Sequence, residues 1–536
     1  MRELVIPGFL SAAGLVAQVQ PAWTNSYQQA PERNHYLNDM EANTAGDVWL
    51  YGIANDTIDW ATGMVVKYAQ HGLVQEWTVE FMDIGQFTDI DIDDSNNVHV
   101  GTTTYDTIGD TRSNYLTKKI SSDGQVLWSA VYTGIGPNNL DRAKALCVDA
   151  QGNTIITGFG DRPDYHFDWH TVKYDPMGNQ LWVATHAPPT DFNGTDGGID
   201  ITTDGAGNIY VTGESHDTAN GDFATIKYAP DGTELWLRRE GGYTYSQGRV
   251  VRVIGDRVYV AGQFTYDGLD STDVLIAAYD TAGTHLWTTM FNAPPSWTTD
   301  HVNGRETIED LQVDAEGNVH ITGTQFAGNG WRDDYMIVKL DADGDLLWHQ
   351  YYGAGTNWDD PRAMLVDDVG NVYVTGRCDA APEGYSPVHT VAYSASGEQI
   401  WYAPYTTGYW DGCHPGMVDW DHNDHMYVGA SSNGQNGGQL FLLVYALPNA
   451  VPQTSATTAL VLDPYTAGGR LDVDLSSLQG SVRLHVMDSG GRSVRDQWIT
   501  GGSIQGLPVT DLPAGMYVLQ VASGNRAAMA RFVVGR

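Results

Sequence analysis

One short segment recurs along this 536-residue chain, and it limits the possible folds more than any other feature. The segment Gly370–Gly376 reads GNVYVTG, and eight copies of it or its relatives lie between residues 46 and 430. In seven copies an apolar run, a glycine turn and a tryptophan follow: Trp77, Trp128, Trp182, Trp236, Trp287, Trp348 and Trp401. From Trp77 to Trp401 the chain advances 324 residues in six intervals, a mean period of 54. A fixed period of this size is typical of a repeat architecture.

Each repeat contains four strand-like runs, which in the sixth are residues 310–314, 318–322, 335–339 and 347–351. Turns of the form Asp-x-x-Gly separate the first run from the second and the third from the fourth. Four-stranded units repeated in this way close radially into a β-propeller, which leaves few exposed sheet edges.

The eighth copy ends near Tyr445 without a tryptophan strand, and Trp23–Tyr27 resembles the missing strand. We therefore predict an all-β fold, an eight-bladed β-propeller over residues 18–450 that is closed by the N-terminal strand. A loose N-terminal tail is the alternative.

The repeat stops after a polar linker at residues 451–458, and another β pattern fills residues 459–536. Three motifs in order, Val486–Val494, Leu512–Leu519 and Phe532–Val534, resemble the C-terminal sorting domain of the type IX secretion system of Bacteroidetes-type bacteria. That family often opens with Asn-Pro, where this chain has Asp463-Pro464. The resemblance implies a small C-terminal β-sandwich, the type IX secretion machinery as a partner, and passage through the periplasm to the outer cell surface or beyond. An ordinary small β-sandwich is the alternative.

Other features agree with export. Residues 1–17 have the form of a signal peptide, with Arg2 before an apolar run and Ala17 at the cleavage position. This run is too short to span a bilayer, and no later stretch is long and apolar enough, so we expect no membrane span. The propeller repeats also resemble bacterial β-propeller repeats of large secreted proteins, often described as seven-bladed, and that family implies no single activity.

The formal net charge of −38 argues against nucleic acid or an anionic membrane as a partner. It suits divalent cations or a salty habitat, although solubility alone also explains it. Three cysteines exclude a disulfide framework. Cys378 and Cys413 fall in loops expected on one face, where a single disulfide between them stays open.

Tryptophans out of register with the repeat predict a binding surface. Six are assigned to loops on the face opposite the Asp-x-x-Gly turns: Trp60, Trp169, Trp297, Trp331, Trp358 and Trp410. The last four lie on consecutive loops, and Asp333 and Asp359 lie near them. Aromatic rings beside carboxylates suit a glycan or protein ligand. The alternative is that these rings pack the loops against one another.

The innermost strand of each repeat carries carboxylates on the face expected to line the central channel. By strand parity these are Asp39, Glu41, Asp89, Asp91, Asp200, Asp310 and Asp419. Converging carboxylates repel one another unless a cation, water or Arg249 compensates. Calcium is the cation expected for such oxygen ligands, with Asp39, Asp89, Asp91, Asp200 and Asp310 as ligands; a water-filled tunnel is the alternative.

A second metal candidate is the turn that holds His422 and His425 beside Asp421 and Asp424, which suits a transition metal. The chain has none of the usual hydrolase, metalloprotease or phosphate-loop motifs, so no catalytic residue is assigned. We predict a secreted binding or adhesion module for a glycan or protein. An extracellular polysaccharide lyase or hydrolase, or a purely structural surface protein, stays open. A quinoprotein fits less well, because the turn spacing is one residue shorter and no adjacent cysteine pair exists.

Overall fold

The computed structural model describes most of the propeller strands and much of the C-terminal segment. The described residues are 2–3, 17–28, 34–55, 61–84, 89–105, 112–136, 140–162, 167–187, 196–216, 221–241, 245–265, 272–291, 306–326, 333–353, 358–378, 387–405, 411–423, 425–433, 438–447, 465–467, 470–474, 481–488, 493–500, 504–509, 512–513, 515–523 and 526–534. Within these ranges every regular element is a strand, and no helix is long and apolar enough to cross a membrane.

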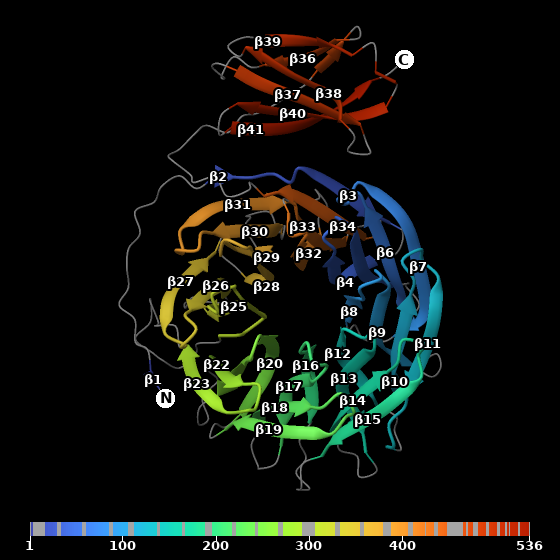
Figure 1. Ribbon diagram of the computed structural model, residues 1–536, viewed down its shortest axis with the longest axis vertical. Helices are drawn as coiled ribbons and strands as arrows, with labels where there is room; N and C mark the ends of the chain where they lie inside the picture. The colour runs from blue at the N-terminus through green and yellow to red at the C-terminus, as the bar shows by residue number, and fades with distance from the viewer. Residues whose placement is uncertain are drawn as a thin grey trace.

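Eight antiparallel units surround a central channel, as the sequence predicted (Figure 1). Blades 1 to 4 run from the channel outward as β4 (Asn34–Ala42), β5 (Val48–Asn55), β6 (Ala61–Ala69) and β7 (Val74–Ile84); β8 (Asp89–Ile92), β9 (Val98–Tyr105), β10 (Ser113–Ile120) and β11 (Val126–Tyr132); β12 (Arg142–Val148), β13 (Thr154–Asp161), β14 (Phe167–Tyr174) and β15 (Gln180–His186); and β16 (Gly197–Thr203), β17 (Ile209–Ser215), β18 (Asp222–Tyr228) and β19 (Glu234–Glu240).

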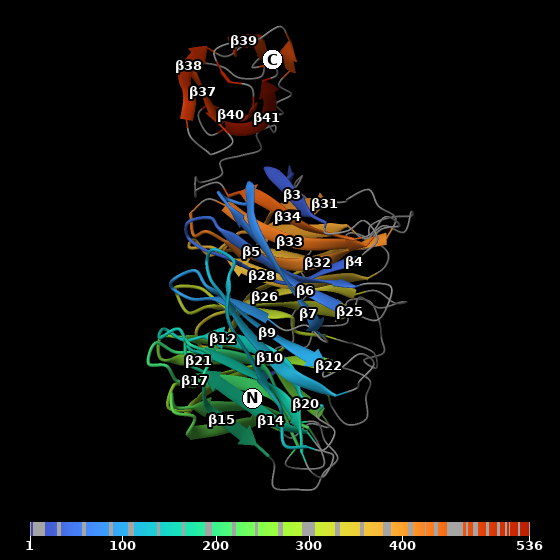
Figure 2. The same cartoon turned by 90° about the vertical axis from the view of Figure 1, so that its right-hand side faces the viewer.

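Blades 5 to 8 repeat this order as β20 (Tyr245–Ile254), β21 (Arg257–Thr265), β22 (Thr272–Asp280) and β23 (His285–Phe291); β24 (Asp310–Val313), β25 (Val319–Phe326), β26 (Asp333–Leu340) and β27 (Leu346–Tyr352); β28 (Asp359–Val366), β29 (Val372–Cys378), β30 (Val388–Tyr393) and β31 (Gln399–Tyr405); and β32 (Asp411–Trp420), β33 (His425–Asn433) and β34 (Gln439–Ala446). The tight turns that follow the first and third strands all lie on one side of the ring, here called the turn side (Figure 2). The opposite side is called the loop side.

Blade 8 takes its outermost strand from the other end of the chain. β3 (Trp23–Tyr27) lies antiparallel to β34, with Trp23 opposite Val444 and Tyr27 opposite Leu440. Two shorter strands, β1 (Arg2–Glu3) and β2 (Ala17–Gln18), lie parallel to the outer strands β23 and β31. The N-terminal segment therefore contacts the outer edges of three blades.

The register tryptophans connect each blade to the next. The indole N–H of Trp128 donates to the carbonyl of Pro176 at 3.0 Å, and that of Trp182 donates to Pro230 at 3.0 Å. Each acceptor lies in the turn between the third and fourth strands of the following blade, and Trp23 reaches blade 1 in the same way through His71 at 2.9 Å. Gly178 in one such turn has φ +85°, and an added Cβ would meet the Trp128 ring at 2.7 Å. The repeated glycine therefore allows the positive φ of the turn and also leaves room for the tryptophan ring packed on it.

The C-terminal segment forms two sheets. One contains β35 (Tyr465–Ala467), β36 (Arg470–Asp474) and β39 (Ile504–Pro508); the other contains β38 (Ser493–Thr500), β37 (Ser481–Asp488), β40 (Gly515–Ser523) and β41 (Arg526–Val534). A buried cluster joins residues of both sheets, including Leu471, Leu484 and Leu519.

Candidate functional site

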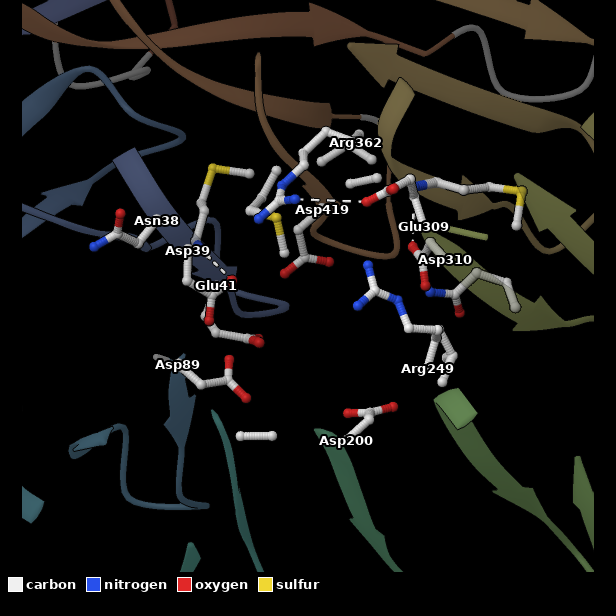
Figure 3. Close-up of a pocket in the computed structure, with 18 of the residues that line it drawn as sticks. Asn38, Asp39, Glu41, Asp89, Asp200, Arg249, Glu309, Asp310, Arg362 and Asp419 are labelled. Carbon is white, nitrogen blue, oxygen red and sulfur yellow. Dashed lines mark hydrogen bonds and ion pairs between the residues drawn. The ribbon is translucent and has the colours of Figure 1, made fainter. Parts of the chain in front are cut away.

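A polar cavity of about 370 Å³ lies in the central channel (Figure 3). Innermost strands of all eight blades contribute to its lining. Six of the seven carboxylates assigned to the channel from strand parity line it: Asp39, Glu41, Asp89, Asp200, Asp310 and Asp419. Asp91 lies on the same strand as Asp89 but is not among the lining residues.

Five innermost strands carry a one-residue β-bulge at the same level, on the loop side of the acidic positions, and β32 has a wider register shift between Pro415 and Val418. In the five one-residue bulges the strand pairing skips Asn38, Lys144, Ile199, Arg249 and Arg362. All five skipped residues line the cavity. A bulge places an extra residue in one strand and redirects its side chain. The ring of bulges therefore supplies the loop-side mouth of the channel with side chains that strict alternation would not place there.

Three of these redirected side chains are cations, from blades 3, 5 and 7. Arg249 and Arg362 point their head groups into the channel in Figure 3. Arg362 pairs with Glu309 at 3.5 Å, and Lys144 lies 5.4 Å from the centre of the Phe159 ring. Burial lowers the pKa of Lys144, and the charges of Arg142 and Arg249 lower it further. The positive charges of Arg142 and Arg249 therefore act on Lys144 at this mouth.

The carboxylates below the mouth hold neighbouring blades together. The carboxylate of Asp39 accepts the backbone N–H of Met40 in its own strand and that of Ile90 in blade 2, both at 2.8 Å. The same contact to the next blade recurs five more times: Asp89 with Leu146, Asp91 with Val148, Asp200 with Val251, Asp310 with Met364, and Asp419 with Ala42. These hydrogen bonds satisfy backbone donors that strand pairing within a blade leaves open.

The carboxylates of blades 8, 1 and 2 form an acidic sector. Burial raises the pKa of Glu41 well above its usual range, and the charge of Asp419 raises it further. Burial likewise raises the pKa of Asp419 and that of Asp91 to about 7. Asp39 and Asp89 hydrogen-bond to each other, and the pKa of Asp89 is raised by burial and by the charge of Asp39. Two carboxyl groups this close share one proton unless a cation takes its place.

The carboxylates of blades 4 and 6 have a different partner. Arg252 joins them, with its guanidinium 2.8 Å from Asp200 Oδ2 and 3.3 Å from Asp310 Oδ1. An arginine already supplies the positive charge that calcium would bring to this pair. Of the five predicted calcium ligands, Asp200 and Asp310 are therefore already paired with a cation. Calcium in the channel stays a prediction.

The structure describes only part of the predicted tryptophan surface. Trp60, Trp297, Trp331 and Trp410 lie outside the described residues. Trp358 lies just before β28 and is 41% exposed, whereas the adjacent Asp359 is buried. Asp333 begins β26 and is partly exposed. The binding role of these residues stays a prediction.

The loop assignment of Trp169 is wrong. Trp169 belongs to β14, is fully buried, and donates its indole N–H to Thr157 Oγ1 at 3.2 Å. The third strand of blade 3 starts at Phe167, earlier than the apolar run suggests, because its first residues still pair with β13. For the cysteines, Cys378 is buried at the end of β29, and the side chain of Cys413 lies outside the described residues, so their pairing stays a prediction.

Comparison with known families identifies two parts of the chain. Residues 347–380 match a family described as beta-propeller repeat, and residues 465–535 match one described as secretion system C-terminal sorting domain. The protein is a type IX-sorted β-propeller. Its sorting domain directs secretion to the cell surface or outside, with the type IX secretion machinery as a partner. No curated protein matches the chain.

Several solved structures resemble this type IX-sorted propeller in fold. Sqt1 from Chaetomium thermophilum is 10% identical, covers 79% of this chain and 100% of its own, and gives a TM-score of 0.46. The β-propeller domain of the Trilobed protease from Pyrococcus furiosus is 11% identical, with coverage of 68% and 92% and a TM-score of 0.36. A protein of unknown function from Bacteroides caccae is 11% identical, with coverage of 60% and 94% and a TM-score of 0.31.

Proposed function

We propose that this secreted propeller is a binding module for an acidic glycan, which docks at the loop-side mouth of the channel. The observation that carries the proposal is the convergence of Lys144, Arg249 and Arg362 at that mouth. The chain has only 28 lysines and arginines against 66 aspartates and glutamates. Three of these few cations lie on bulges at one level of the ring.

Part of the acidic charge in the channel has partners other than the three cations. Asp200 and Asp310 are paired with Arg252, and burial and the charge of Asp39 raise the pKa of Asp89, whereas Glu309 pairs with Arg362 at the mouth. Arginine presents a planar set of donors that matches a carboxylate, such as the uronate group of an acidic sugar. The mouth therefore suits a ligand with separated negative charges better than a neutral one.

Trp358 extends the proposed site outward. It stands four residues before Arg362, and an extended strand covers about 13 Å over four residues. An exposed indole within reach of polar groups is typical of sites that combine an apolar contact with directed hydrogen bonds. Trp297, Trp331, Trp410, Asp333 and Asp359 are proposed contributors to the same loop-side surface.

The test is a glycan array followed by calorimetry with one uronate-containing oligosaccharide and its neutral counterpart. Arg249→Gln, Arg362→Gln and Trp358→Ala should each weaken binding by about 1–3 kcal/mol, because each removes a contact in the site. Lys118→Gln, which removes the same charge from β10 away from the channel, is the matched control and should bind normally. Equal affinity for the acidic and neutral sugars, or for Arg249→Gln and the unmodified protein, would refute the proposal.

A further inference from the structure

Three side chains of types that can ligate a metal meet where blade 8 adjoins blade 1. His71 lies in the turn between β6 and β7, Asp421 follows β32, and His425 begins β33. Nδ1 of His71 and Nδ1 of His425 are each 3.1 Å from Asp421 Oδ2. Within the described ranges, this is the one group of three histidine, cysteine or acidic side chains whose ligand atoms all lie within 4.8 Å of one another.

The other blades show what these histidines replace. In blade 6 the turn residue Asp314 receives Lys339 at 3.1 Å and the side-chain amide of Asn318 at 2.8 Å. Blades 2 and 3 have the same arrangement, with Lys119 and Asn97 on Asp93, and Lys173 and Asn153 on Asp149.

Blade 8 lacks both of these partners. His425 stands at the asparagine position of the turn. In blade 6 the lysine Lys339 is paired with His320, and the corresponding pair in blade 8 is Val444 with Tyr427. Val444 therefore stands at the lysine position. The buried carboxylate of Asp421 has thus exchanged a lysine and an amide for two imidazoles. Although burial opposes it, hydrogen bonds from His425 and His71 hold the pKa of Asp421 below its usual range.

We propose that His71, His425 and Asp421 bind a divalent transition-metal ion, zinc by preference, which fastens blade 8 to blade 1. Two imidazole nitrogens and one carboxylate oxygen are a usual zinc ligand set. Ligand atoms about 2.0–2.1 Å from a tetrahedral ion lie about 3.3 Å apart, close to the 3.1 Å separations here.

The surroundings of the three ligands suit such a site. The exposed fraction of the side chain is 38% for His71, 14% for His425 and 0% for Asp421. A bound ion would therefore have one fully buried ligand, Asp421, and would be accessible to solvent beside His71. The hydroxyl of Tyr427 lies 3.2 Å from Asp421 Oδ2, where it orients the carboxylate. Trp23 of β3 lies beside the site, its ring 5.4 Å from that of His425.

This site corrects the metal candidate drawn from the sequence. His422 takes no part in it, because its ring lies against Trp420 with 4.6 Å between centroids. Asp424 lies outside the described residues. The second histidine comes instead from blade 1, 350 residues before Asp421, and only closure of the ring brings the two together.

The experiment uses the full chain, stripped with a chelator and titrated with zinc by calorimetry, and with cobalt by visible absorption. His71→Asn and His425→Asn are the test variants. Asparagine tolerates the positive φ of 57° at His71, and at position 425 it restores the residue of the other turns. His422→Asn, in the same turn, is the matched control.

We expect one zinc per chain, a tetrahedral cobalt spectrum, and a melting temperature that rises with free zinc. Each test variant should lose affinity by at least about 100-fold and lose the zinc-dependent rise, while His422→Asn keeps both. Absence of zinc binding in the unmodified protein would overturn the proposal. So would retention of that binding in the His71→Asn, His425→Asn double variant, or its loss in His422→Asn.

Discussion

Removal of residues 18–30 takes β3 away from the outer edge of blade 8. The backbone contribution of this strand is small, because a net gain of about 1 kcal/mol per hydrogen bond is offset by an ordering cost of about 1–2 kcal/mol per residue. The side chains decide the result. Trp23 and Tyr27 pack against the cluster that contains Leu440, Leu442 and Val444, and Trp23 donates to His71. Since a buried tryptophan is worth about 3–5 kcal/mol and Trp23 is partly exposed, we expect a loss of about 3 kcal/mol.

The assay is guanidinium denaturation of the deletion variant and of Trp23→Ala, followed by tryptophan fluorescence and circular dichroism. Both variants should unfold at lower denaturant concentration by similar amounts, and Trp182→Ala, which breaks an equivalent contact between blades, should do the same. Trp358→Ala is the control that leaves stability unchanged. If the deletion left the midpoint unmoved, β3 would not stabilise the ring, and the assignment of blade 8 would fail.

Four further outcomes are expected. A chain ended at residue 450 should melt like the full propeller but remain inside the cell; normal secretion of it would contradict the role of the sorting domain. Stability should fall as pH rises from about 4.5 through about 7, because a carboxyl with a raised pKa binds more protons folded than unfolded in that window. In Glu41→Gln the denaturation midpoint should depend less on pH over this window. An unchanged pH dependence would contradict the raised pKa of Glu41. Calcium added above pH 7 should raise the melting temperature if it replaces a proton between Asp39 and Asp89. An unchanged melting temperature would contradict calcium binding in the channel. Gly178→Ala should lower the free energy of unfolding, measured by denaturation, by about 1–3 kcal/mol, because its Cβ would meet the Trp128 ring. An unchanged free energy would show that the turn can shift to accommodate the added Cβ.

The repeat could be predicted from the sequence because its signals are local. A glycine turn and a tryptophan at a fixed spacing specify one blade, and the missing strand near Tyr445 indicated where the N-terminal strand belongs. The structure places β3 in that position. The channel carboxylates were also accessible to sequence reasoning, since strand parity assigns them to one face.

The cationic mouth was missed for a physical reason. A β-bulge shifts the alternation by one residue, so strict parity does not place Lys144 and Arg362 on the channel face, and of the three cations only Arg249 was named from the sequence. The small residues beside the bulges, such as Gly198 and Gly248, were the available signal. Parity also does not show which hydrogen bonds a carboxylate makes. The contacts of Asp39 and its equivalents to the next blade depend on the curvature of the whole ring, and so does the meeting of His71 with Asp421.

The pairing of β3 with β34 also sets the order of events during synthesis. The ribosome makes β3 among the first elements of the propeller and β34 as the last, so the two edges remain open until nearly the entire propeller has been made. Contacts between such distant segments form slowly, because a very long loop must close before they are gained. A chain interrupted within blade 8 would therefore present two unsatisfied strand edges, which invite pairing with other chains.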